Sequence, residues 1–168
     1  MECIHSGIET FYKQHVDWTC GLAALRTLLN ATHFKYHRLS EETLIEKNDL
    51  LQLVHGPKTG ADLKLIAGSL YRNHAENPIL TKENMLSLGK DLSVVELFKE
   101  YNMAVECSLM GGHWLPIVSI MSCSTENKVT LYDSYFDSLI ELELQQFEAL
   151  WRDEILLKNE HEFIAVRR

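Results

Sequence analysis

A cysteine stands where an apolar helix is predicted to begin. Cys20 is followed by a glycine and then by apolar residues spaced three and four apart, the pattern of a helix that buries one face. The first turn of a helix presents unsatisfied backbone N–H groups and the positive end of its dipole, and both favour a thiolate. This position therefore suits a nucleophile. Gln14, six positions earlier, carries amide donors that could stabilise negative charge on a substrate oxygen beside the sulfur.

Two further side chains could complete a nucleophilic site. His113 follows two glycines, which allow a substrate to approach closely, and it begins an apolar strand. Asp133 ends the next predicted strand, and in an antiparallel hairpin that end lies near the start of the preceding strand. A carboxylate there would set the imidazole tautomer and stabilise the imidazolium that forms when the thiol proton moves. Cys20, His113 and Asp133 are therefore a candidate catalytic triad.

The order of these residues resembles the papain-like cysteine peptidases, specifically the C39-like branch, over most of the chain. In that branch a Gln precedes the Cys by the same interval, Cys-Gly opens a helix containing Ala-Ala-Leu, Gly-His begins a strand, and an Asp ends the next strand. The resemblance implies that Cys20 is the nucleophile and His113 the base. It also implies that Asp133 is the orienting acid and Gln14 the oxyanion donor. The matching residues are Gln14, Cys20-Gly21-Leu22-Ala23-Ala24-Leu25, Gly112-His113, Asp133 and, in a following short helix, Phe147 and Trp151.

Three residues depart from the family pattern. Leu22 stands where the family often has Pro, and Ser134 follows Asp133 where Pro is frequent. Pro116 interrupts the strand that begins at His113. Because proline lacks a backbone N–H, we expect this part of the strand to lie at a sheet edge or at a bulge. None of the three departures removes a catalytic group.

The N-terminal half of the chain has the periodicity of helices. Capping residues precede several apolar stripes, as in Ser93-Val94-Val95-Glu96, where a serine and a glutamate form a capping box. The second predicted helix stops before Gly56-Pro57 and the fourth near Asn102. The predicted helices of this half begin after Thr19, Ser40, Thr59 and Ser93.

The C-terminal half changes to a period near two, which is typical of strands. A helical stretch interrupts these strands around residues 144–152. The predicted fold class is α+β: the papain-like cysteine protease fold, with a helical N-terminal half packed on a mainly antiparallel C-terminal β-sheet. The predicted strands cover residues 103–109, 114–121, 129–133 and 162–166.

Composition restricts the function further. The 168 residues suffice for one packed domain, and no repeat or linker divides them, so we expect a single catalytic domain over 1–168. The net charge is −8 and the sequence has no Lys/Arg-rich run, which argues against nucleic acid as a partner. The acidic stretch 141–144 is predicted to be a solvated face. The sequence contains neither a Sec-type signal nor a membrane-spanning stretch. These features predict a cytoplasmic protein without a membrane partner, with signal-independent export left open.

The other cysteines are predicted to be reduced and inert. Cys3, Cys107 and Cys123 show no CxxC spacing and no basic neighbours in sequence. Thiol redox sensing at Cys20 ranks last among the functions considered, because no resolving cysteine is near it in sequence.

The remaining histidines give weaker signals. His33 and His37 have the i, i+4 spacing of two metal ligands, but they lack a third ligand and fall in a predicted loop. We therefore predict no metal and no other cofactor. His161 could replace His113 as the base, yet it has neither the preceding glycines nor the following strand with an Asp.

The sequence thus predicts a peptidase-like, cysteine-dependent hydrolase that attacks a peptide or amide carbonyl of a protein or peptide substrate. A protein glutamine deamidase or an acyl transferase is the alternative within the class, because one thioester intermediate serves several acceptors. A catalytically silent homologue that binds a protein partner is the alternative from a different class. The pattern selects neither a particular substrate nor an oligomeric state.

Overall fold

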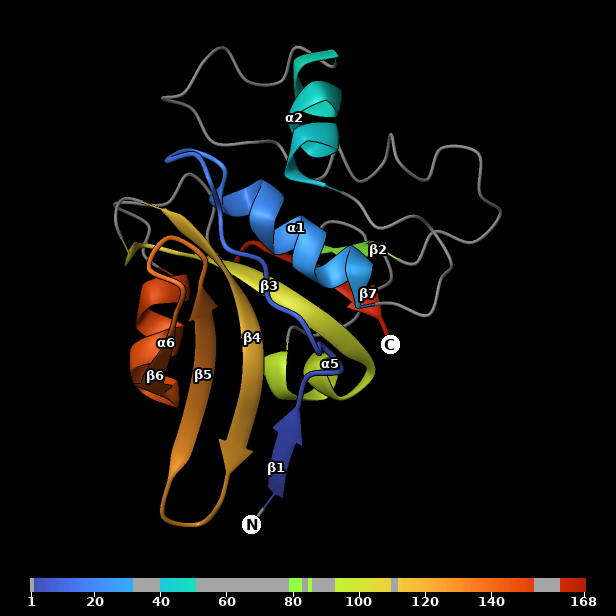
Figure 1. Ribbon diagram of the computed structural model, residues 1–168. Helices are drawn as coiled ribbons and strands as arrows, with labels where there is room; N and C mark the ends of the chain where they lie inside the picture. Colours follow the sequence, from blue (N-terminus) through green and yellow to red (C-terminus); the bar gives the residue numbers. More distant parts are fainter. Residues whose placement is uncertain are drawn as a thin grey trace.

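Figure 1 shows the computed structural model of the chain, which describes residues 2–31, 40–50, 79–82, 85, 93–109, 112–152 and 161–168. The helix predicted over residues 59–71 and the pair His33 and His37 lie outside this part. The helices are α1 (Cys20–Asn30), α2 (Glu41–Leu50), α5 (Val94–Glu100) and α6 (Leu144–Trp151). The strands are β1 (Glu2–His5), β2 (Ile79–Thr81), β3 (Tyr101–Cys107), β4 (His113–Ser122), β5 (Asn127–Asp133), β6 (Ser138–Glu143) and β7 (Phe163–Arg167).

The strands form one seven-stranded sheet in the order β2-β7-β3-β4-β5-β6, with β1 added beside β4. Every strand pairing in this sheet is antiparallel. The predicted α+β class with a mainly antiparallel sheet is therefore confirmed. Hairpins join β4 to β5 and β5 to β6, so the start of β4 and the end of β5 lie at the same end of the sheet.

The strand that carries Pro116 lies inside the sheet. Pro116 pairs with Ala104 of β3, while β5 runs along the other side of β4. The expectation of a sheet edge was therefore wrong, but the expected irregularity exists: the register with β5 shifts between Ile117 and Ser119. Beyond Pro116 the neighbour of β4 changes from β3 to β1, which pairs with it from Ser119 onward. The missing N–H thus falls where β4 exchanges one partner strand for another.

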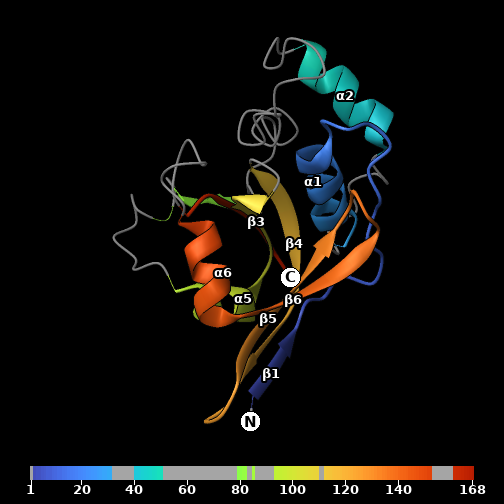
Figure 2. The ribbon, with the colours of Figure 1, turned by 90° about the vertical axis from the view of Figure 1, so that its left-hand side faces the viewer.

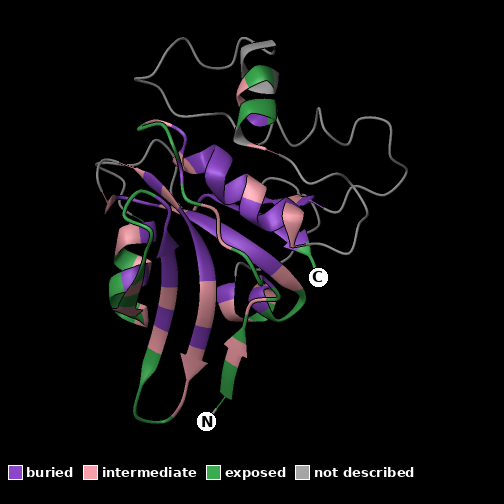
Figure 3. Ribbon diagram, in the orientation of Figure 1, coloured by how far each residue is buried: buried purple, intermediate pink, exposed green. Residues whose placement is uncertain are grey.

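Helices cover both faces of the sheet, with α1 on one face and α5 and α6 on the other (Figure 2). Helix α1 is buried along nearly its whole length, as the colouring of Figure 3 shows. Its leucines pack against Ala104, Ile164 and Val166, whereas the second apolar cluster joins Phe98, Phe147 and Trp151 to the opposite face. Because β3, β4 and β7 contribute side chains to both clusters, their backbone positions are fixed from both sides.

The helix starts predicted after Thr19, Ser40 and Ser93 are confirmed, with one correction at α1, whereas the start after Thr59 lies outside the described residues. The side chain of Ser40 accepts from the Thr43 N–H at 3.1 Å, and that of Ser93 accepts from the Glu96 N–H at 3.4 Å. Thr19 occupies the N-cap position of α1, but its side chain makes no cap bond. Its hydroxyl donates to the Val16 carbonyl at 2.8 Å instead, so it closes the preceding loop.

Three strands were missed from the sequence: β1, β2 and β6. The last of these contains most of the acidic stretch that was expected to be a solvated face. Glu141 and Glu143 are indeed exposed, but Ile140 and Leu142, which alternate with them, are half-buried against the second apolar cluster. The stretch is therefore an amphipathic edge strand with one solvated face. None of the described helices is long and apolar enough to cross a membrane.

Candidate active site

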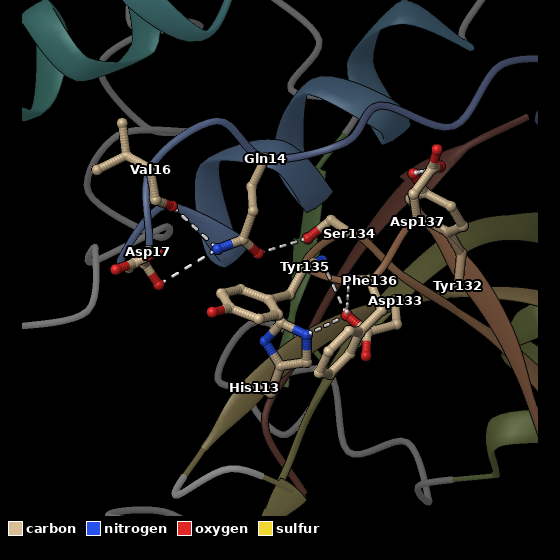
Figure 4. Close-up of polar contacts among 10 residues, drawn as sticks. All are labelled: Gln14, Val16, Asp17, His113, Tyr132, Asp133, Ser134, Tyr135, Phe136 and Asp137. Atoms are coloured by element: carbon tan, nitrogen blue, oxygen red, sulfur yellow. Dashed lines mark hydrogen bonds and ion pairs between the residues drawn. The ribbon is translucent and has the colours of Figure 1, made fainter.

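Two side chains from neighbouring strands meet at one end of the sheet. His113 is the first residue of β4 and Asp133 the last of β5. The imidazole Nε2 lies 2.9 Å from the carboxylate Oδ1, and the two residues are only 4% and 3% exposed (Figure 4). Such burial protects the bond from competition with water. Asp133 therefore fixes the ring orientation and supports a proton on Nε2, as the sequence predicted.

The entry into β4 depends on a glycine. Gly112 has a φ of 107°, a backbone conformation that residues with a Cβ rarely adopt. Its N–H donates to the Leu109 carbonyl at 3.2 Å, which closes a tight turn immediately before His113. The turn at Gly112 thus sets the backbone position from which the His113 side chain extends.

The carboxylate of Asp133 is held by its own turn. The same oxygen that faces His113 also accepts from the backbone N–H groups of Tyr135, at 2.8 Å, and Phe136, at 3.4 Å. The turn closes with Asp137, whose φ of 53° is left-handed and whose carboxylate accepts from the Tyr132 hydroxyl at 2.7 Å. Three donors on one oxygen fix the carboxylate before any substrate arrives.

The third candidate residue, Cys20, belongs to the N-terminal half of the chain. It is the first residue of α1 and is partly exposed, so a reagent can reach its sulfur. Burial acts to lower the pKa of His113, but hydrogen bonding to Cys20 and Asp133 and the negative charges of both partners outweigh it, and the pKa is raised. The thiol of Cys20 and the carboxylate of Asp133 thus both favour the protonated imidazole. Because Nε2 faces Asp133, Nδ1 is the ring nitrogen left for the thiol.

Gln14 lies beside the site and is 5% exposed. Its amide nitrogen donates to the carbonyls of Val16, at 2.9 Å, and Asp17, at 3.2 Å (Figure 4). Both acceptors belong to the loop that leads to Cys20. The Gln14 side chain thus holds the loop that precedes Cys20. The sequence did not predict these two hydrogen bonds.

Ser134 is a site residue that sequence reasoning treated only as a departure. Its hydroxyl donates to the Gln14 side-chain oxygen at 2.8 Å, and its carbonyl accepts from the Gln14 backbone N–H at 3.1 Å. Ser134 is 1% exposed and directly follows Asp133. It therefore connects the oxyanion candidate to the end of β5. Its place next to Asp133 was the one available signal, but a small polar residue there equally suggests ordinary turn chemistry.

His161 does not belong to this site. Its Nε2 lies 2.5 Å from the Glu148 carboxylate, and its ring meets the edge of Trp151. It lines a cavity of about 740 Å³ between α5 and α6, and none of the candidate triad residues lines that cavity. Nucleophile chemistry needs its reacting groups in contact, so the hydrogen-bonded pair at the ends of β4 and β5 is the candidate site, and this cavity is not.

The remaining cysteines differ from one another. Burial raises the pKa of Cys107 to about 12, in keeping with an inert thiol. Cys123 differs from the predicted inert thiol, because its pKa is lowered. The main cause is a hydrogen bond with the Thr125 hydroxyl, followed by hydrogen bonds with the backbone of Thr125 and Glu126. Cys123 lies in the exposed β4–β5 turn, and no sequence pattern singles out this position. All four cysteines are described, and none forms a disulfide.

Within the described ranges no group of three or more His, Cys, Asp or Glu side chains is arranged to hold a metal ion. Comparison of the sequence with protein-family models gives no match, and comparison with curated proteins gives none either. The function must therefore be argued from the residues and their geometry.

Proposed function

We propose that this protein is a peptidase-like, cysteine-dependent hydrolase of the papain-like fold, acting on a peptide or amide carbonyl. One observation carries the proposal: a buried aspartate holds His113 at 2.9 Å, and the partly exposed Cys20 at the start of α1 helps to raise the pKa of that histidine. Nucleophile, base and orienting acid are the three parts that thiol acyl transfer requires.

The acylation step uses Cys20 and His113. The thiol proton moves to His113, the sulfur bonds to the carbonyl carbon, and the carbonyl electron pair moves to the oxygen. Collapse of this intermediate breaks the C–N bond, and the imidazolium gives its proton to the departing amine. Asp133 stabilises the positive charge that His113 carries between these two transfers.

The oxyanion needs hydrogen-bond donors near the N-terminus of α1. The first-turn N–H groups of the helix supply positive electrostatic potential there, and the amide of Gln14 supplies a side-chain donor. This amide now donates to the Val16 and Asp17 carbonyls. A hydrogen bond to an oxyanion is roughly twice as strong as one to a neutral carbonyl, so a developing charge can draw one amide hydrogen away from the loop.

Deacylation returns the site to its starting state. His113 takes a proton from water, the resulting hydroxide attacks the thioester carbon, and the C–S bond breaks. The acid leaves, and the thiolate regains its proton from the imidazolium. Another amine or alcohol in place of water would make the same site a transferase.

The decisive experiment incubates the full chain with a mixed peptide library and follows new termini by mass spectrometry and free ammonia by an enzymatic assay. We expect new termini with the wild type and at least about a thousandfold less with Cys20→Ala or His113→Ala. The matched control is Cys123→Ala, which removes an accessible thiol outside the site and should keep full activity. Ammonia without new termini identifies a glutamine deamidase instead, and full activity of Cys20→Ala overturns the proposal.

A further inference from the structure

Most of the exposed large apolar side chains of the described ranges lie on the two segments that carry the candidate site. They are Val16, Tyr135, Phe136 and Leu139, which are 38%, 41%, 64% and 61% exposed. Three of the four lie on the two segments that build the site. Val16 stands in the loop between Gln14 and Cys20, while Tyr135 and Phe136 follow Asp133 in the β5–β6 turn.

The aromatic pair is attached to the triad through its backbone. The N–H groups of Tyr135 and Phe136 donate to the Asp133 oxygen that also faces His113. Their rings contact each other edge to face with centroids 4.9 Å apart, and Figure 4 draws both rings in the same region as the imidazole. The backbone that carries each ring is therefore held by the carboxylate that also binds His113, while the ring itself is exposed.

Val16 is held in a similar way. Its carbonyl accepts from the Gln14 amide at 2.9 Å and from the Thr19 hydroxyl at 2.8 Å. These bonds fix the backbone of the loop that leads to Cys20, while the valine side chain stays exposed. Exposed apolar surface therefore lies on both segments that build the candidate site.

Leu139 provides an internal contrast. It pairs with Tyr132 across the β5–β6 ladder, whereas Asp133 pairs with Ser138. Side chains alternate between the two faces of a strand, and directly opposite residues share a face, so Leu139 lies on the face opposite to that of Asp133. It is as exposed and as apolar as Phe136 and sits in the same hairpin, but it belongs to β6 and lies outside the turn whose N–H groups bind Asp133.

We propose that Val16, Tyr135 and Phe136 form an apolar recognition surface for a bulky aromatic or aliphatic side chain next to the carbonyl that Cys20 attacks. This inference rests on the proposed function and adds the substrate class: peptides or proteins with an apolar residue beside the reacting bond. Rigid apolar surface favours such a partner, because its burial is favourable and little conformational entropy is lost. Edge-to-face or stacked contacts with the two rings would add to this preference.

The test compares two electrophiles that differ only in the attached group. N-phenethyl iodoacetamide carries an aromatic ring, and N-(2-hydroxyethyl) iodoacetamide carries a polar group of small size. Both alkylate the sulfur with loss of iodide, and the full chain with Cys3→Ser and Cys123→Ser confines the reaction to Cys20 among the accessible thiols. The quantity measured is the ratio of the two second-order rate constants, divided by the same ratio for free cysteine.

We expect this normalised ratio to be about five in the parent chain. It should fall to about one in Phe136→Ser and in Tyr135→Ser. In the control Leu139→Ser it should stay near five. The substituted side chains are exposed and the backbone donors to Asp133 remain, so the rate with the hydroxyethyl reagent confirms an intact site in each variant. A ratio of one in the parent chain overturns the inference. So does an equal fall in Leu139→Ser, or a dimer in gel filtration that Phe136→Ser dissociates, because the surface would then be a contact between copies. A slow reaction of Cys20 with both reagents would instead contradict the proposed function.

Discussion

At the scale of single residues, the account depends on one carboxylate oxygen. Asp133 Oδ1 accepts from the His113 ring and from the backbone of Tyr135 and Phe136. The sequence predicted the first of these contacts, because an Asp at the end of one strand and a His at the start of its neighbour are brought together by an antiparallel hairpin. It did not predict the other two, because they depend on the conformation of a turn.

Ser134 gives the first residue-scale prediction. Ser134→Ala removes the donor to the buried Gln14 oxygen, and an unsatisfied buried acceptor costs about 1–3 kcal/mol. We expect kcat/KM to fall roughly tenfold on whichever peptide the library identifies. In a Gln14→Ala background the same substitution should have little further effect, because Ser134 acts by positioning Gln14. Additive losses in the double variant would show that Ser134 has only a structural role.

The second residue-scale prediction concerns the pKa of His113. Hydrogen bonding to Cys20 and the charge of Cys20 help to raise the pKa of His113 against the effect of burial. In Cys20→Ala both contributions disappear while burial remains, so the pKa of His113 should be lower than in the wild type. Titration of the ring resonances by NMR measures this. Cys123→Ala is the control that should leave the value unchanged, and an identical pKa in Cys20→Ala would mean that the thiol does not contact the ring.

At the scale of elements, the site depends on where helices and strands begin and end. Periodicity predicted the start of α1 at Cys20 and the extent of α6 to within a residue, because both have an apolar stripe and a clear first turn. It missed β6, where the acidic residues drew attention away from the alternating Ile140 and Leu142. It allowed Pro116 either a sheet edge or a bulge, and could not choose between them because a single sequence does not reveal that two strands share one side of β4.

Helix α1 positions the nucleophile through its packing, which predicts a cost for truncating its core side. Leu25 is fully buried between the helix and the sheet. Leu25→Ala should lower the free energy of unfolding by about 2–5 kcal/mol, as large-to-small substitutions in cores do. Urea denaturation measures this loss. Leu139→Ala, at an exposed position, is the matched control and should change stability by less than about 0.5 kcal/mol. Equal effects of the two would place α1 outside the core.

At the scale of the whole molecule, two cores on opposite faces of one sheet hold the end of β4 and β5 in place. The α+β class and the antiparallel sheet followed from the change of period along the chain. The order of the strands did not, because β7 and β1 join the sheet through contacts that are distant in sequence. A buried histidine with a raised pKa in this framework makes stability depend on pH.

The sign of that dependence follows from His113. A folded-state pKa above the unfolded value means that the folded protein binds the proton more tightly. The stabilisation is therefore complete below the ordinary pKa of about 6.5 and is lost as the pH rises through the raised value. The free energy of unfolding of the wild type should decrease, relative to His113→Gln, as the pH rises from 6 to 9. Urea titrations across this range test the slope, and an increase would contradict the assignment.

The central claim is that Cys20 is a nucleophile activated by His113, and the rate of its alkylation by iodoacetamide tests this most directly. The measurement uses the full chain with Cys3→Ser and Cys123→Ser between pH 5 and 9, and mass spectrometry identifies the modified residue. We predict rapid alkylation below pH 7 that falls roughly tenfold in His113→Ala but not in His161→Ala, which removes a histidine outside the site. Slow alkylation below pH 7, or a rate indifferent to His113, would contradict the account and favour a protein that binds a partner without catalysis.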